Sequence, residues 1–136
     1  MKSGIDLSPA SVQSFVTSLQ GVAMRVTDAS LSGMDSAASR LYERTQVSVP
    51  RVTGALASSG KVSNQDSGSV LHRTIGYGDK TANPRTGRAT EDYAVLVHEI
   101  FHPAHPNSFK WLERTVQQYG SEAFIRELAT AIRRAL

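Results

Sequence analysis

The sequence contains no cysteine, so disulfide bridges, thiolate zinc sites and cysteine nucleophiles are all excluded. It also lacks any apolar run near the roughly 20 residues that a membrane-spanning helix needs. Residues 1–9 show no apolar segment of the kind found in a secretory signal. We therefore expect a chain that is synthesised in a cytoplasm and does not enter a membrane.

A strong excess of charge of one sign is also missing. The net charge is +3 and the sequence pI is about 9.5, but the basic residues are spread thinly and do not form a nucleic-acid footprint. Gly76, Gly78 and Gly87 fit neither a dinucleotide-binding pattern nor a P-loop. No nucleophile elbow surrounds Ser58 and Ser59. These absences argue against nucleotide binding and serine hydrolase chemistry.

The composition that remains is that of one globular domain. The chain has 136 residues, of which 40% are hydrophobic and 20% charged, close to the average of globular proteins. This length suits a single core, so we expect one domain spanning residues 1–136.

The N-terminal third predicts helices over about residues 8–48. Ser8 and Pro9 suit an N-cap and the first helical position, and Leu7 could pack on Val12. Gly21 offers a place for a first short helix to stop or bend. A second, longer helix is expected beyond it, because the following residues form an apolar stripe: Val22, Val26, Ala29, Gly33, Ala37 and Leu41. The small residues of this stripe allow close packing on a sheet or on a neighbouring subunit, and we favour packing in the core.

Pro50 should end that helix, and a mostly antiparallel sheet is expected over about residues 55–102. Residues 64–68 are typical of a hairpin connection, and residues 70–77 alternate as a strand. Residues 78–91 carry Lys80, Arg85 and Arg88 without periodicity, which predicts a long mobile loop. Residues 93–101 are rich in Tyr, Val, Ile and Phe, which favours a strand without excluding a short buried helix.

C-terminal helices are expected over about residues 107–136. Asn107 is a plausible cap, Gly120 a plausible pause, and Arg133 and Arg134 suit the negative end of the helix dipole. The order of elements predicts an α+β fold: a small, mostly antiparallel β-sheet packed against a long N-terminal helix and C-terminal helices.

One motif suggests an enzyme. His98, Glu99 and His102 match H-E-x-x-H, in which two histidines one helical turn apart bind zinc and the glutamate is the general base. However, Pro103 disfavours the helical conformation for His102, which places the second histidine outside any helix. We therefore predict that no metal lies between His98 and His102, and that Glu99 matters for assembly or local structure.

A third zinc ligand is also hard to find. An extended metzincin motif would need glycine at position 105 and histidine at position 108, where this sequence has His105 and Ser108. A glutamate ligand from Glu113, Glu122 or Glu127 stays open, so a zinc peptidase is kept as an alternative. Otherwise we expect no catalytic, cofactor-binding or metal-binding residue.

Three blocks of residues resemble tailed-phage tail-completion and minor structural proteins, which include tail terminators. The first follows V-P-x-x-T-G-x-L-x-x-S, the second follows Y-A-x-x-V-H-E, and the third resembles the segment that opens the last helix of that family. Their matching residues are Val49, Pro50, Thr53, Gly54, Leu56 and Ser59; Tyr93, Ala94, Val97, His98 and Glu99; and Phe109, Lys110, Trp111, Leu112 and Glu113. The sequence departs from the family's common Glu-Phe-Gly-Thr at Glu99, Ile100, Phe101 and His102.

This resemblance implies a non-enzymatic virion protein at the head-tail junction. Tail terminators form a homo-oligomeric ring, commonly a hexamer, that ends the tail tube and joins it to the head. The implied partners are other copies of the chain, the tail tube protein, a head-completion or connector protein, and genomic DNA that passes through without sequence-specific binding. A different neck ring is the main alternative, and a toxin or DNA-binding module acting through Arg85 and Arg88 is a third.

Overall fold

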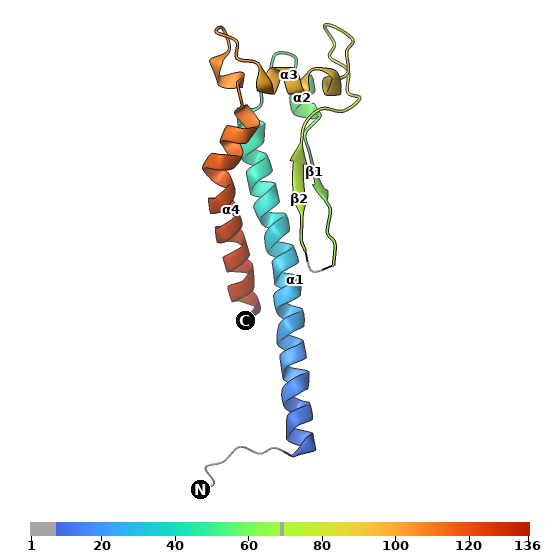
Figure 1. The fold of residues 1–136 in the computed structure, drawn as a ribbon, viewed down its shortest axis with the longest axis vertical. Helices are drawn as coiled ribbons and strands as arrows, with labels where there is room; N and C mark the ends of the chain where they lie inside the picture. The colour runs from blue at the N-terminus through green and yellow to red at the C-terminus, as the bar shows by residue number, and fades with distance from the viewer. Residues whose placement is uncertain (1–7, 69) are drawn as a thin grey trace.

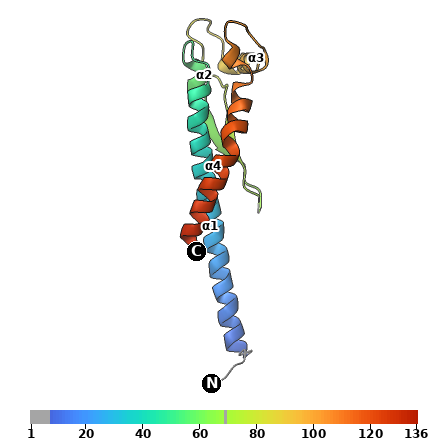
Figure 2. The same cartoon turned by 90° about the vertical axis from the view of Figure 1, so that its left-hand side faces the viewer.

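The protein is described by a computed structural model that covers residues 8–68 and 70–136. Helices α1 and α4 lie side by side and antiparallel, and a β-hairpin flanks α1 (Figures 1 and 2). The expected α+β class is confirmed. In chain order the elements are α1 (Pro9–Ser48), α2 (Ala55–Ser58), β1 (Lys61–Asn64), β2 (Arg73–Gly76), η1 (Thr90–Asp92), α3 (Ala94–Glu99), η2 (Pro106–Ser108) and α4 (Trp111–Ala135).

Helix α1 is a single helix of 40 residues, so the expected division at Gly21 is wrong. A glycine inside a helix costs about 1 kcal/mol but keeps its backbone hydrogen bonds, so the helix can continue through it. The start is as predicted: the Ser8 hydroxyl accepts a hydrogen bond from the Ser11 amide at 3.3 Å. Leu7 lies outside the described residues. Helix α1 ends before Pro50, where Val49 is extended as expected.

The small residues of the predicted stripe bring α1 close to α4. Ala29, Gly33 and Ala37 are buried, and a Cβ built on Gly33 would lie 2.9 Å from the Cα of Leu128. The backbones of the two helices therefore touch at Gly33. The prediction of close core packing is confirmed, but the stripe packs on helix α4 of the same chain and not on a sheet.

The sheet is smaller than the sequence predicted. Strands β1 and β2 pair antiparallel, with Lys61 opposite Gly76 and Asn64 opposite Arg73. Leu56 lies on the short helix α2 instead of a strand. The hairpin connection predicted at residues 64–68 is confirmed, but it is longer and runs to residue 72. Within it the Asp66 carboxylate accepts a hydrogen bond from the His72 amide at 2.9 Å.

Arg73 ties this hairpin to α1. Its side chain is only 5% exposed, and its guanidinium contacts Asp35 of α1 at 2.7 Å and Asp66 at 2.5 Å. The two carboxylates raise the pKa of Arg73, and the hydrogen bond to Asp35 is the largest cause. The ion pair with Asp35 therefore links the hairpin to α1.

The strand favoured at residues 93–101 is instead the helix α3. Tyr93, Ala94 and Val97 pack inward, whereas Val95 and Leu96 are 67% and 50% exposed. This spacing of three to four residues covers a surface on one side only, as an amphipathic helix does. A short apolar run does not distinguish the two conformations by periodicity, and the packing of one face decided this case.

The C-terminal third is one helix, α4, and the predicted pause at Gly120 is wrong. It begins at Trp111, later than the expected cap Asn107, and Lys110 precedes it with a φ of 54°. Arg133 and Arg134 occupy the last turn, as predicted.

The expected loop at residues 78–91 has backbone hydrogen bonds of its own. The Asn83 amide donates to the Arg88 carbonyl at 2.8 Å, and the Thr90 amide donates to the Thr81 carbonyl at 2.8 Å. It is therefore a defined excursion, and its mobility in a free monomer stays a prediction.

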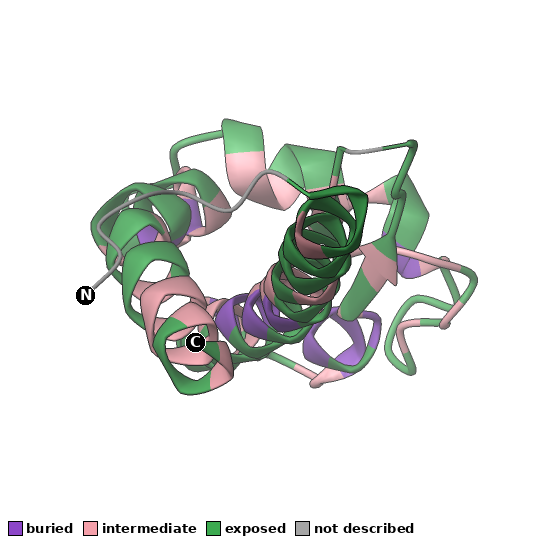
Figure 3. Ribbon diagram, turned by 90° about the horizontal axis from the view of Figure 1, so that it is seen from below, coloured by how far each residue is buried: buried purple, intermediate pink, exposed green. Residues whose placement is uncertain are grey.

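The surface of the molecule is unusually large for its mass. The structure exposes 9474 Å², whereas a compact monomer of 14.7 kDa exposes about 6,900 Å². Figure 3, seen from below, shows the near end of α1 coloured mainly as exposed. Among the described residues, no helix has both the length and the apolar character that a membrane crossing requires.

Candidate functional site at the junction of three sequence blocks

The three sequence blocks meet at one end of the α1–α4 pair. Val49, Leu56, Ala57 and Trp111 form a buried group that we term the junction cluster. The ring of Tyr77 packs edge-on against Trp111 with centroids 4.8 Å apart. Partly buried residues packed around this cluster are Tyr77, Tyr93, Ala94, Val97 and Leu112. Segments about 60 residues apart in the chain thus share one core.

The first block forms the turn that follows α1. Gly54 has a φ of 82°, a conformation that favours glycine, and the Thr53 hydroxyl accepts a hydrogen bond from the Ala55 amide at 3.3 Å. Ser59 is 1% exposed; its hydroxyl donates to the Leu56 carbonyl at 2.6 Å and accepts from the Gly78 amide at 2.8 Å. These residues join α1, α2 and the end of the hairpin.

A polar network that the sequence did not indicate lies beside the cluster. The hydroxyls of Thr45 and Tyr77 are 2.7 Å apart. The side-chain amide of Gln46 donates to the hydroxyl of Tyr42 at 2.9 Å and to the backbone carbonyl of Ala57 at 3.0 Å. Burial raises the pKa of Tyr77. Sequence reasoning missed this network because its members are polar residues on different elements, without a motif that links them.

The H-E-x-x-H segment does not form a helical zinc motif. Helix α3 ends at Glu99 and Ile100 is extended, so His102 lies beyond the helix, as Pro103 predicted. Both ring nitrogens of His98 have partners: Nδ1 lies 2.9 Å from the Glu99 carboxylate, and Nε2 accepts from the Glu113 amide at 3.3 Å. These partners assign the proton to Nδ1.

Glu99 and His98 both contact Lys110, the residue that precedes α4. The Glu99 carboxylate lies 2.5 Å from the Lys110 ammonium, and the Lys110 amide donates to the His98 carbonyl at 2.7 Å. Lys110, and to a lesser extent His98, lowers the pKa of Glu99. The Glu99 carboxylate thus links the end of α3 to the start of α4.

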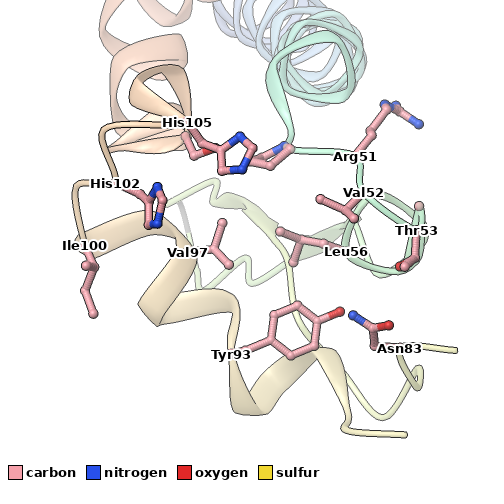
Figure 4. A pocket seen from close by; sticks show the side chains of 13 residues that line it. Arg51, Val52, Thr53, Leu56, Asn83, Tyr93, Val97, Ile100, His102 and His105 are labelled. Carbon is pink, nitrogen blue, oxygen red and sulfur yellow. The ribbon is translucent and has the colours of Figure 1, made fainter. Parts of the chain in front are cut away.

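Two of the other three histidines, His102 and His105, line a cavity of about 600 Å³. Their rings, from His102 and His105, are 5.5 Å apart and lie on one side of it, with Tyr93 and Asn83 on the opposite side (Figure 4). Arg51 extends outward in this view. Two histidines fall short of the three or four protein ligands that zinc usually has.

The other candidate ligands lie elsewhere in ion pairs. Glu113 is 3.5 Å from Lys110, while Glu122 pairs with Arg126 and Glu127 with Arg40. Over residues 8–68 and 70–136, no three His, Asp or Glu side chains are grouped so that they could hold a metal ion. The structure therefore gathers the second-block residues with the core and leaves the candidate zinc ligands apart.

Comparison of the chain with protein-family models, with curated proteins and with solved structures finds no match. The fold and the site define the chain as an antiparallel helix pair with a flanking hairpin, organised around the junction cluster. The resemblance to phage structural proteins rests on the residues of the three blocks.

Proposed function

We propose that the chain is a structural, non-enzymatic subunit of a tailed-phage virion. Copies of it form a ring, commonly a hexamer in the family it resembles, at the head-tail junction. The ring ends the tail tube and joins it to the head-completion or connector protein, and genomic DNA passes through it. The observation that carries this proposal is that all three blocks of the resemblance contribute to one packed junction.

The distribution of apolar residues supports assembly. Among the residues that the structure describes, only three large apolar side chains are buried, Val49, Leu56 and Trp111, whereas Phe15 is 65% and Phe101 56% exposed. Large exposed apolar surfaces mark interaction sites.

The role of the H-E pair supports a structural reading of the second block. His98 and Glu99 each contact the segment that begins α4, with the Glu99 carboxylate on Lys110. This arrangement accounts for both residues without a metal or a substrate.

The test is a joining assay with phage particles. A phage that lacks this gene should accumulate filled heads and separate tails, and addition of the purified full-length protein should join them. Electron microscopy would count joined particles, and immunogold would locate the protein at the junction. Normal joining without the protein, or its absence from particles, would refute the proposal; the symmetry of the ring would separate a terminator from another neck protein.

A metal analysis tests the enzyme alternative directly. The proposal expects purified protein to hold no stoichiometric zinc, and His98→Ala to alter stability without altering metal content. Stoichiometric zinc that is lost on His98→Ala would support the peptidase instead.

A further inference from the structure

The N-terminal part of α1 extends beyond the rest of the molecule. Arg134 and Ala135, near the end of α4, lie beside Arg25 of α1 across a surface pocket. Residues 9–24 therefore project alone over about 24 Å, at 1.5 Å per residue (Figures 1 and 2). We term this segment the α1 extension.

The extension has an apolar stripe without a partner in the described structure. Val12, Phe15, Leu19 and Val22 are 46%, 65%, 52% and 36% exposed. Their spacing of three and four residues places them on one face, in line with the stripe that packs on α4 further along α1. The same stripe of α1 is thus buried where α4 covers it and exposed beyond the end of α4.

The composition of the extension makes a free helix unfavourable. Residues 9–24 contain no charged side chain, and half of them are Ser, Thr, Val or Gly, which have modest to poor helix propensity. Most helical stability in proteins comes from packing of an apolar face. A helix of this composition needs a covering partner.

A groove of suitable shape lies on the same chain. It runs between α1, β2 and α4, has a volume of about 390 Å³, and its apolar walls include Leu41, Ile75, Val116 and Phe124. From Val116 to Phe124 it follows α4 for about 12 Å, or two helical turns. Gly120 lies midway between Val116 and Phe124 along it. We term this surface the α4 groove.

The groove and the extension match in charge as well as in length. The one charged residue of the groove, Arg73, is already paired with Asp35 and Asp66, so covering it leaves no unpaired charge. The anchors Phe15, Leu19 and Val22 span about 10 Å of helix, close to the length of the groove. An apolar helix face in an apolar groove is a recurring mode of recognition.

We propose that the α1 extension of one copy docks into the α4 groove of a second copy. Because α1 is continuous, the extension does not fold back into the groove of its own chain. The contact joins two different surfaces, so it is head-to-tail and can be repeated around an axis. It deepens the proposed ring, and rests on the proposed function for the closure of that ring at a head-tail junction.

The pairing accounts for both open surfaces. Each copy would bury one extension and one groove. Symmetric pairing of two extensions would cover the stripe but leave the groove open.

The first experiment measures oligomeric state by light scattering on the purified full-length protein. We expect an oligomer whose apparent dissociation constant rises at least about 30-fold in Phe15→Glu, because a buried aromatic anchor is replaced by a charge. The control Thr17→Glu adds the same charge on the opposite face and should leave assembly unchanged. A monomeric wild type, or equal effects of the two variants, would overturn the proposal.

The second experiment identifies the two surfaces. The chain has no cysteine, so Ser18→Cys beside the stripe and Ser121→Cys in the groove are the only thiols that a short bismaleimide can join. We expect a cross-linked dimer only when the two variants are mixed. A cross-linked dimer of Ser18→Cys alone would show that two extensions pair symmetrically. The absence of a cross-link in the mixture would show that the extension does not bind the groove. Either result overturns the proposal.

These results separate the interface from the function. If docking fails but the protein still joins heads to tails, the interface is wrong and the proposed function stands. If docking holds but the protein is absent from particles, the proposed function is wrong and the interface stands.

Discussion

The contact at Gly33 makes a prediction whose sign is opposite to that of the usual glycine substitution. In Gly33→Ala the new Cβ would lie 2.9 Å from the Cα of Leu128, 3.1 Å from its Cδ1 and 3.2 Å from the Cβ of Ala131. The Cα is backbone, so no side chain can rotate to relieve the contact. Helix α4 has to move away from α1.

Two opposing effects set the magnitude. Alanine gains about 1 kcal/mol over glycine in helix propensity. Overpacking of a close contact costs about 1 to 3 kcal/mol, and the upper part of that range applies where backbone has to shift. We therefore expect a net loss of about 1 to 2 kcal/mol in the free energy of unfolding, which lowers the Tm by roughly 3 to 8 °C.

Gly120→Ala is the matched control, since it lies in the same helix pair. Its Cβ would meet Val116 at 3.5 Å and Leu41 at 3.9 Å, which are ordinary contacts. We expect a gain of about 0.5 to 1 kcal/mol. Urea and thermal unfolding followed by circular dichroism, at one protein concentration, would compare both variants. If Gly33→Ala stabilises the chain as much as Gly120→Ala, the close helix contact is wrong.

Three further predictions concern the junction. Lys110, and then His98, lower the pKa of Glu99 below its ordinary 4.5, so the stabilisation of the fold by the Glu99 carboxylate is present at neutral pH and is lost as the pH falls through the lowered pKa. Glu99→Gln should therefore be less stable than the wild type at neutral pH and equally stable in acid. A difference that does not change with pH in urea unfolding would contradict the ion pair. Trp111→Ala should lower the free energy of unfolding by about 3 to 5 kcal/mol. Trp111→Phe should lower it much less, because the buried indole N–H has no hydrogen-bond partner among the described residues. Equal losses for the two variants in denaturant titrations would disprove this. Gly54→Ala should lower the free energy of unfolding by about 1 to 2 kcal/mol, because alanine is strained at the φ of 82° even though its Cβ would meet nothing within 4 Å. An unchanged Tm would refute this strain.

Much of the helical architecture could be read from local signals. Ser8 with Pro9, and Val49 before Pro50, fix the ends of α1 because capping and proline act on their immediate neighbours. The failures at Gly21 and Gly120 share one cause: a glycine lowers helix propensity without breaking the hydrogen-bond ladder, so flanking helix prevails.

The site was predicted less completely. Pro103 correctly placed His102 outside a helix, since that effect is local. The contacts of Glu99 with Lys110, and of Ser59 with Gly78, join residues far apart in the chain and carry no sequence spacing of their own.

The sequence by itself determined the absence of thiol chemistry, the α+β class, the limits of α1 and the small-residue stripe, because these follow from composition and from interactions within a few residues. Only the tertiary structure decided that residues 93–101 form a helix, that the stripe faces α4, and that three sequence blocks meet in one cluster. It also decided that the apolar stripe of α1 continues beyond the end of α4. Such features depend on which faces meet in space, and a linear pattern does not specify that.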